Sequence, residues 1–345
     1  MAGEEHLRLS QYIKNVHEDL RFSSRNLGWK QAWVEHCNRK EVLEEYASAM
    51  HELATKFWES KEESNINSRI EWVAKQCQWY FFDGGLQDIN DQDLVKICRI
   101  DSIPKEQSSY ISDAYLDLSF NNPLFLLDVG SCYNPLKTFS MFKTIAIDLA
   151  PATSDVFKCD FLELCVGGSD KDSDFDSVRR KLACPLNLSE LPCEWFDVVN
   201  FSLFLEYLPS SLLRFECCKK AFELLKPGGL LFIISPDSKH ASANAPLMKS
   251  WRIALGTLGF VRISYQKLTH LHCMAFRKCP YSILRTNLVE RFERYAKIPP
   301  SDMIVIPQDL TVHTSEVASD SINCATDDSV DSVNVNFFPE LPLSY

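Results

Sequence analysis

Short apolar runs, each leading to a glycine or an acidic residue, mark the middle of the chain. Leu124 to Leu127 form the clearest run, and Gly130 follows three residues later. A wholly apolar run that is too short for a core helix predicts a strand buried on both faces of a parallel sheet. Thr144 to Ile147 form a second, largely apolar run that Asp148 follows directly. Two neighbouring buried strands are therefore expected.

The same alternation continues to about residue 278. Strands are predicted just before Asp160, over 195–203 and over 230–234, and a closing pair joined by a turn over 260–265 and 271–276. Helices are predicted over 215–225, where Lys-Pro-Gly-Gly ends the helix, and over 247–258. Strands that alternate with helices predict an α/β protein with a doubly wound, Rossmann-like parallel sheet.

The N-terminal part has a helical period instead, up to about residue 82. One apolar stripe recurs at spacings of three and four, at Leu43, Tyr46, Met50, Leu53 and Phe57. Five tryptophans crowd the same region, at positions 29, 33, 58, 72 and 79. We interpret them as packing between helices and against the sheet, with a partner surface as the alternative. The predicted domains are a helical N-terminal domain (1–118), a sheet domain (119–298) and a tail (299–345).

Charge is distributed unevenly along the 345 residues. The net charge is −11, and the last 45 residues contain eight acidic residues and no Lys or Arg, so the rest of the chain is close to neutral. The tail is expected to be largely disordered, with Ile304 to Pro307 and Phe337 to Leu343 as apolar islands that could dock. The acidic net charge disfavours a nucleic-acid partner but does not exclude one, because a local basic patch can be hidden in the average charge.

Cysteine usage and hydropathy indicate in which cellular compartment the protein is expected. The 13 Cys include no Cys-x-x-Cys pair, and Cys98, Cys217 and Cys273 fall inside apolar segments. Reduced thiols that pack as small hydrophobic groups are typical of intracellular proteins. No apolar run reaches the length of a membrane span, and no signal peptide is visible at the start. A cytoplasmic protein without a membrane span is therefore expected.

The spacing of Gly130 and Asp148 predicts a nucleotide site. A glycine turn after one strand lets a ligand approach the backbone, because glycine lacks a Cβ atom. An acidic residue about 20 positions later, at the tip of the next strand, is typically the acceptor for ribose hydroxyls.

Taken together, these motifs resemble a known superfamily. The Asp128-Val-Gly130 turn and Asp148 are similar to motif I and the ribose acid of class I S-adenosylmethionine (SAM) methyltransferases. The 156–161 segment resembles their adenine-binding turn, and Leu224-Leu-Lys-Pro-Gly-Gly resembles the helix end and glycine turn before strand five. Within that superfamily the whole chain most resembles the Bmt2/SAMTOR family. One branch of this family methylates adenine N1 in large-subunit rRNA, and the animal branch is a SAM sensor for TOR signalling.

The resemblance implies a set of cofactor-binding residues for SAM, and for S-adenosylhomocysteine, which shares the adenosine part. Each expected contact matches one part of the cofactor: Gly130 and Ser131 for the methionyl part, Asp148 for the ribose, Leu149, Asp160 and Phe161 for the adenine, and Asn200 and Ser202 for the methionine amine. Motif I of the class I methyltransferases has further glycines where this chain has Cys132 and Asn134. Their side chains are expected to restrict how closely the ligand approaches the backbone.

The methionine carboxylate also needs a cation, and the first turn of the site contains none. Arg69 or Lys75, on a predicted helix that Asn67 or Ser68 would cap, is our hypothesis for this cation. Exposed charges on the surface of a helix are the alternative interpretation.

No catalytic residue can be named from the sequence. Asn200-Phe-Ser-Leu lacks the two prolines that shape a base slot in many adenine-amine methyltransferases, and Glu206 and Tyr207 are the remaining candidates for catalytic aids. His270 and His272 share a strand face whereas Cys273 points away, so no metal site is predicted.

Three functions compete at this point: a SAM sensor, an rRNA adenine-N1 methyltransferase, and a methyltransferase for a protein or a small molecule. The acidic balance and the missing catalytic motif favour the sensor. For the sensor branch, the resemblance implies that the protein binds the GATOR and KICSTOR complexes when SAM is scarce, restrains TOR complex signalling and is recruited to the lysosomal surface through these partners.

Overall fold

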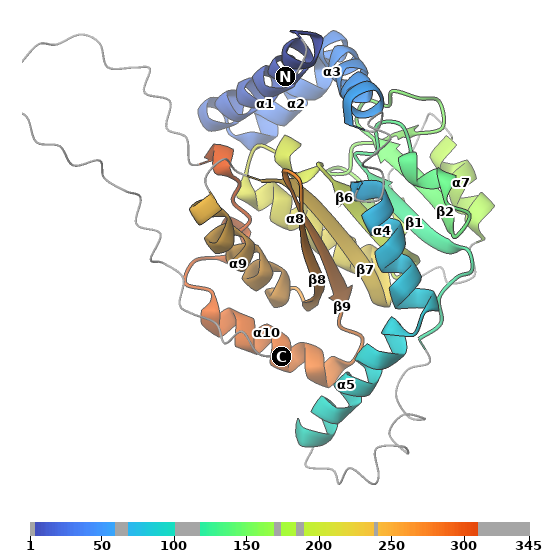
Figure 1. The fold of residues 1–345 in the computed structure, drawn as a ribbon. Coiled ribbons are helices and arrows are strands. Elements are labelled where there is room, and N and C mark those ends of the chain that lie inside the picture. The colour runs from blue at the N-terminus through green and yellow to red at the C-terminus, as the bar shows by residue number, and fades with distance from the viewer. Residues whose placement is uncertain are drawn as a thin grey trace, which may run out of the picture.

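The computed structural model describes residues 4–58, 68–100, 118–168, 174–183, 190–237 and 241–309. A seven-stranded sheet runs through the centre of this part of the molecule (Figure 1), in the order β3-β2-β1-β6-β7-β9-β8. Its strands are β1 (Leu124–Val129), β2 (Phe142–Asp148), β3 (Phe157–Lys158), β6 (Phe196–Ser202), β7 (Leu225–Pro236), β8 (Phe260–Leu268) and β9 (Leu271–Lys278). A small second sheet pairs β4 (Cys165–Gly167) with β5 (Glu190–Pro192).

Strand directions confirm the predicted doubly wound sheet. The first five strands in this order are parallel, while β9 is antiparallel to β7 and β8 is antiparallel to β9. The antiparallel pair at the edge is the closing pair that the sequence predicts. Because β1 lies between β2 and β6, which run parallel to it and come from different halves of the chain, the carboxyl ends of β1, β2 and β6 meet at one edge.

Helices cover both faces of the sheet and one of its ends. Their bounds are α1 (Glu4–Leu27), α2 (Trp29–Asn38), α3 (Lys40–Glu52), α4 (Arg69–Cys77), α5 (Gly85–Ile100), α7 (Phe175–Ala183), α8 (Ser211–Leu224), α9 (Ala241–Thr257) and α10 (Ser282–Tyr295). Short π-helical turns follow α3 at Leu53–Trp58 and α4 at Gln78–Phe82, and 3₁₀ turns occur at Pro135–Thr138, Leu205–Tyr207, Pro300–Asp302 and Pro307–Asp309.

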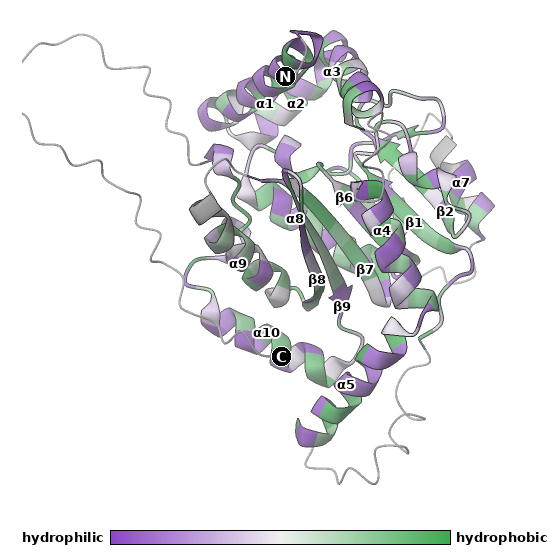
Figure 2. Ribbon diagram, in the orientation of Figure 1, coloured by the Kyte–Doolittle hydropathy of each residue, from purple (hydrophilic) through white to green (hydrophobic). Residues whose placement is uncertain are grey.

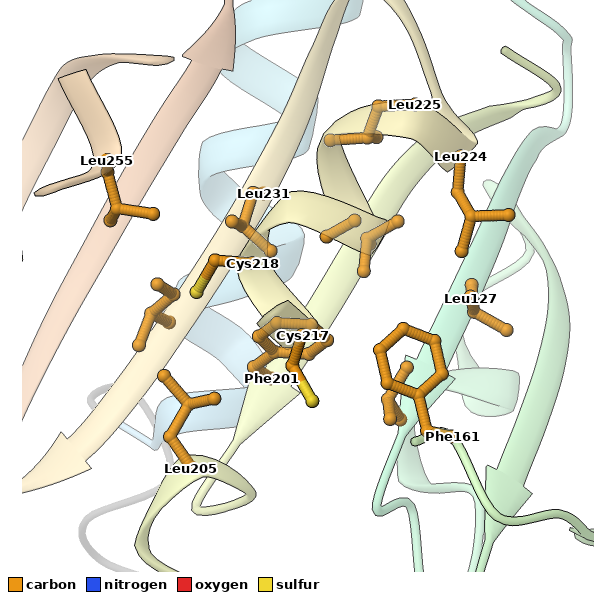
Figure 3. Close-up of a cluster of buried hydrophobic side chains, with 14 of the residues drawn as sticks. Leu127, Phe161, Phe201, Leu205, Cys217, Cys218, Leu224, Leu225, Leu231 and Leu255 are labelled. Carbon is orange, nitrogen blue, oxygen red and sulfur yellow. The ribbon is translucent and has the colours of Figure 1, made fainter. Parts of the chain in front are cut away.

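Strand β1 is buried on both faces, as its composition predicts. Leu127 belongs to the core beneath α7, α8 and α9, whereas Leu126 belongs to a second core on the opposite face. The central strands accordingly include long apolar stretches (Figure 2). Figure 3 shows the first core, in which Leu127, Phe201 and Leu231 of the sheet pack near Cys217 of α8. The thiol of Cys217 is a packing group here, and burial raises its pKa.

The second core lies between the sheet and a helix of the N-terminal part of the chain. Helix α4 packs Trp72, Val73 and Cys77 against the sheet, and the rings of Trp72 and Phe232 meet edge to face with centroids 5.6 Å apart. Ser68 caps this helix by accepting a hydrogen bond from the backbone N–H of Glu71 at 3.1 Å, which confirms one of the two predicted caps. This part of the helical region is thus a layer of the sheet domain.

Helices α1, α2 and α3 lie at the carboxyl-end edge of the sheet (Figure 1). Leu9, Ala49 and Leu53 form a small core of their own between α1, α3 and the turn that follows α3. Trp33 of α2 and Leu20 of α1 belong to the main core instead. These helices are therefore fixed to the end of the sheet at which its central strands terminate.

The segment 299–309 also packs onto the sheet domain, although its composition placed it with the tail. Met303, Ile304 and Ile306 are buried, and the side chains of Ser250 and Trp251 on α9 donate hydrogen bonds to the carbonyl groups of Met303 and Val305. Ile304 to Ile306 thus form the docked island that the sequence indicates. Phe337 to Leu343 lies outside the described residues. Within the described ranges, no helix is both long and apolar enough to cross a membrane.

Candidate functional site

Two adjoining pockets open at the edge where β1, β2 and β6 end. The Asp148 pocket has a volume of about 80 Å³, and Asp148, Asp160 and Tyr207 lie in its wall. The Asp128 pocket has a volume of about 40 Å³ and contains Asp128 and Arg69 in its wall. Both pockets are lined by Met50, Gly130, Cys132, Ser202 and Leu203. They therefore form one elongated site with two ends.

All eight residues predicted from the sequence line this site. Four of them lie in the wall of the Asp148 pocket: Asp148, Leu149, Asp160 and Phe161. Two lie in the wall of the Asp128 pocket, Ser131 and Asn200, while Gly130 and Ser202 line both. The structure thus brings the residues together, and their roles in holding a ligand remain predictions.

The turn after β1 forms the boundary between the two pockets. Gly130 has φ +70°, and a Cβ atom there would lie 2.9 Å from the ring of Phe204. Cys132 and Asn134 also have positive φ values, of 58° and 55°. The sequence resemblance implies glycine at these two positions, and glycine is the residue that adopts a left-handed backbone without strain. Such a conformation costs roughly 1–2 kcal/mol for a residue with a side chain, and less for Asn.

Asp148 is held by the same turn. Its Oδ2 accepts a hydrogen bond from the backbone N–H of Cys132 at 2.9 Å, and its Oδ1 accepts one from Ala150 at 2.8 Å. Burial raises the pKa of this carboxyl to about 6, and these backbone N–H groups oppose the rise. A carboxylate oxygen can accept two hydrogen bonds. The backbone N–H of Leu149 also lowers this pKa, and a carboxylate has about four acceptor positions, so this carboxylate can still accept a hydrogen bond from a ligand hydroxyl group.

Asp160 lies at the far end of the Asp148 pocket and is bound by a helix of the N-terminal region. The indole Nε1 of Trp33 donates a hydrogen bond to its Oδ2 at 2.7 Å, and the backbone N–H of Leu162 donates to its Oδ1 at 2.9 Å. Phe161 and Leu149 add apolar wall next to this carboxylate. This end of the pocket could therefore bind a flat ring with an exocyclic amino group, because it offers an acceptor for the amino group and an apolar surface for the ring.

A buried polar network forms the floor of the Asp128 pocket. Asp128 accepts hydrogen bonds from the hydroxyl of Ser131 at 2.6 Å and from the amide of Asn200 at 2.7 Å. Burial raises the pKa of Asp128, while these two donors and the charge of Arg69 lower it. The Oδ1 atom of Asn200 is buried and accepts no hydrogen bond from any described residue. It is an acceptor that an ammonium group could use.

Arg69 of α4 supplies the cation of this site, and Lys75 does not. The Arg69 guanidinium donates hydrogen bonds to the hydroxyls of Ser202 at 3.2 Å and Tyr133 at 3.3 Å, and it lines the Asp128 pocket. Lys75 lies on the exposed side of the same helix. Of the two cations that the sequence offered, the structure therefore selects Arg69, because Arg69 begins α4 in the wall of the pocket whereas Lys75 is exposed.

The sequence did not identify the N-terminal residues that close the Asp148 pocket. Trp33, Tyr46 and Met50 form this part of its wall. Two histidines hold the aromatic groups, since His17 is hydrogen-bonded to the hydroxyl of Tyr46 at 2.8 Å and His36 is hydrogen-bonded to that of Tyr207. The apolar stripe at Tyr46 and Met50 was visible in the sequence, but a stripe indicates packing and not what it packs against.

The two candidate catalytic aids are poorly placed for proton transfer. Tyr207 lines the Asp148 pocket, but its hydroxyl is engaged by His36, and burial raises its pKa well above the ordinary value. Glu206 is buried and outside the walls of both pockets, and burial raises its pKa as well.

The histidines considered for a metal do not share a strand face, and His272 has other contacts. His270 lies in the turn between β8 and β9 with φ 63°, whereas His272 of β9 is hydrogen-bonded to Tyr265 and Asp237. Within the part of the chain that the structure describes, no group of three or more His, Cys, Asp or Glu side chains is arranged to hold a metal ion.

Comparison with known proteins decides the family. No family model matches the chain. The protein named S-adenosylmethionine sensor upstream of mTORC1 from Xenopus laevis is 39% identical over 353 residues, an alignment that covers 98% of this chain and 84% of the relative. The chain belongs to this sensor family. Its Danio rerio member, of the same name, is 38% identical over 98% of this chain and 85% of the relative. The resemblance to the SAMTOR family is thereby confirmed.

Two solved structures align with parts of this SAMTOR family member. The N-methyltransferase NodS from Bradyrhizobium japonicum, solved in complex with S-adenosyl-L-homocysteine, aligns with a TM-score of 0.30 and 14% identity over 45% of this chain and 78% of its own. A 1,6-didemethyltoxoflavin-N1-methyltransferase from Burkholderia thailandensis aligns with a TM-score of 0.28 and 15% identity over 46% of this chain and 72% of its own.

Proposed function

We propose that this protein binds SAM across the Asp148 and Asp128 pockets and signals its concentration to the TOR complex pathway. Membership in the SAMTOR family supports the ligand and the pathway. The observation that carries the proposal is that residues of both the N-terminal helices and the sheet line the two pockets. Trp33 of α2 binds Asp160, and Arg69 of α4 binds Ser202. A ligand in this site would therefore contact the N-terminal helices and the sheet at once.

The polar groups of the site match those of SAM one by one. Asp148 is an acceptor that fits the ribose hydroxyls, and Asp160 fits the amino group of adenine. At the other end, Arg69 fits the methionine carboxylate, while Asn200 and Asp128 are acceptors for the ammonium group. S-adenosylhomocysteine has the same groups, so it should bind at the same site.

SAM binding can act as a signal if it changes the affinity for a partner. In this proposal, the GATOR and KICSTOR complexes bind the protein when SAM is scarce, and this binding inhibits TOR complex signalling at the lysosomal surface. SAM would favour the closed arrangement, in which the N-terminal helices contact the site, and the partner would favour another arrangement. A ligand shifts such an equilibrium only by its difference in affinity for the two states.

Linkage makes this proposal quantitative. If SAM weakens partner binding by some factor, the partner must weaken SAM binding by the same factor. Coupling of this kind is typically about 1–3 kcal/mol, or roughly five- to 150-fold. Both affinities can be measured, so the two factors can be compared directly.

The test is capture of GATOR and KICSTOR across a SAM titration by the wild type and by Gly130→Ala. An alanine methyl group would meet Phe204 at 2.9 Å between the two pockets, so this variant should keep the partner and need at least about tenfold more SAM to release it. Gly84→Ala is the matched control, because Gly84 also has positive φ, at +93°, but no atom lies within 4 Å of the added methyl group. It should behave as the wild type does.

Two outcomes would contradict the proposal. Release of the partner from Gly130→Ala at the wild-type SAM concentration would show that SAM binds elsewhere. Partner binding by the wild type that ignores SAM would exclude the sensor function. In that case, incorporation of a labelled methyl group from SAM into large-subunit rRNA would favour the adenine-N1 methyltransferase instead.

A further inference from the structure

Three arginine–carbonyl contacts converge on the turn that follows β6. The turn consists of residues 205–208, and it carries Tyr207 and Leu208 into the wall of the Asp148 pocket. Arg214 of α8 donates hydrogen bonds to the carbonyl oxygens of Leu205 at 3.1 Å and Leu208 at 2.8 Å. Arg21 of α1 donates to the carbonyl oxygen of Glu206 at 2.5 Å. The position of the turn therefore depends on two buried guanidinium groups.

Arg214 connects this turn to the C-terminal segment. Its two terminal nitrogens form a fork with Asp309, at 2.5 Å from Nη1 to Oδ2 and 3.0 Å from Nη2 to Oδ1. Nη1 also donates to the carbonyl oxygen of Ile304 at 2.9 Å. The same carboxylate accepts a hydrogen bond from the backbone N–H of Ile306 at 3.0 Å. Figure 1 shows the segment returning from α10 to the level of the N-terminal helices.

The charges around the turn depend on Asp309. The Arg214 side chain is fully buried, and an ion pair that loses one partner in such a place leaves a costly uncompensated charge. Glu206, on the turn itself, is the other acid that both arginines attract. Its carboxylate is buried, and the hydroxyl of Ser235 lies close enough to lower its pKa. Without Asp309, Arg214 would be drawn toward Glu206, and the turn would move with it.

We propose that the segment Pro300–Asp309 is a positioning element of the SAM site. Asp309 fixes Arg214, Arg214 fixes the 205–208 turn, and the turn holds Tyr207 and Leu208 in the wall of the Asp148 pocket. Asp309 thus acts on the ligand through another residue, at a point where the N-terminal and C-terminal parts of the chain both bind the turn. This inference rests on the proposed function, since it requires SAM to occupy that pocket.

A role in stability alone makes a different prediction from a positioning role. Loss of a structural ion pair lowers the melting temperature but leaves the affinity of the folded protein unchanged. A positioning role lowers the affinity as well. Asp309→Asn in the full chain separates the two, with Asp302→Asn as the matched control, because Asp302 is an exposed acid in the same segment. Phe292→Leu in the core under α10 is a second control that should lower stability only.

SAM affinity is measured by calorimetry and melting temperature by calorimetric scans, both on the full-length protein. Asp309→Asn should bind SAM about fivefold more weakly or worse, the lower end of the usual range for coupled sites. Asp309→Glu, which keeps the carboxylate, should recover part of the loss. Asp302→Asn and Phe292→Leu should bind within about twofold of the wild type. Asp309→Asn with wild-type affinity would overturn the positioning role, whatever its melting temperature.

Hydrogen exchange of the unmodified protein tests the same link without a substitution. If the segment positions the site, SAM must stabilise the segment in return. The N–H of Ile306, which Asp309 binds, should then exchange more slowly with saturating SAM. Unchanged exchange there would overturn the proposal while leaving SAM binding intact. A wild type that binds no SAM at all would instead overturn both this inference and the proposed function.

Discussion

The Asp148 carboxyl should make SAM binding depend on pH between about 5 and 7. Burial raises its pKa to about 6, so in the SAM-free protein it is mostly protonated at the lower end of this range and ionised at the upper end. The ribose hydroxyls donate hydrogen bonds, and an ionised carboxylate accepts them better than a carboxylic acid does. SAM affinity should therefore rise as the pH rises through this window.

The size of the effect follows from the pKa. About one pH unit below it, roughly a tenth of the carboxyl groups are ionised, which corresponds to about 1.4 kcal/mol or tenfold in affinity. Folding stability should change in the opposite direction. The folded pKa of Asp148 lies above its ordinary value of 3.8, so its contribution to stability is complete below that value and is lost as the pH rises through about 6.

The assay is calorimetry of SAM binding at a series of pH values, with the wild type and Asp148→Asn. The variant should bind about ten- to hundredfold more weakly near neutral pH, because hydrogen bonds to a charged group contribute roughly 1.5–3 kcal/mol. Burial lowers the pKa of His17 to about 3 and that of His36 to about 4, so neither changes charge in this range. The series is repeated with His51→Gln as a control, because His51 lies beside the site. The centroid of its ring is 5.4 Å from that of Tyr133, which lines the Asp128 pocket.

The test compares how steeply SAM affinity changes with pH in the wild type and in Asp148→Asn. The wild type should lose about tenfold in affinity toward acidic pH, and Asp148→Asn should lose much less. Equal slopes in the two proteins would show that another group titrates. A flat wild-type profile together with an unchanged affinity in Asp148→Asn would show that the ribose is held elsewhere.

Two further predictions concern the N-terminal helices, with SAM affinity as the measurement in each. Trp33→Phe keeps an aromatic wall but removes the 2.7 Å hydrogen bond to Asp160, so it should weaken binding about fivefold or more, whereas Trp79→Phe, at a residue that is 38% exposed, should not. Equal affinities of these variants would exclude a role for the indole. Arg69→Ala should weaken binding about tenfold or more without unfolding the protein, whereas Lys75→Ala should have no effect. Matching affinities would show that the methionine carboxylate has another partner.

Local sequence was sufficient to predict the strands of the sheet and the site residues that lie at the ends of these strands. A buried parallel strand must be apolar on both faces, so the run Leu124 to Leu127 can be recognised as such a strand from the sequence. The site residues on the sheet, such as Gly130 and Asp148, occupy the ends of such strands, and parallel strands all end at the same edge. Their positions along the chain therefore determine their positions in space.

Only the tertiary structure decided what faces these residues. Trp33 and Asp160 are 127 positions apart, and so no local pattern records their hydrogen bond. An amphipathic helix shows that it has a buried side but not which surface will cover it. For the same reason, the sequence left Arg69 and Lys75 as equal candidates and assigned Asp309 to the tail. The contacts of Arg69 and Asp309 depend on how α4 and the C-terminal segment pack against the sheet, and long-range packing alone determines this.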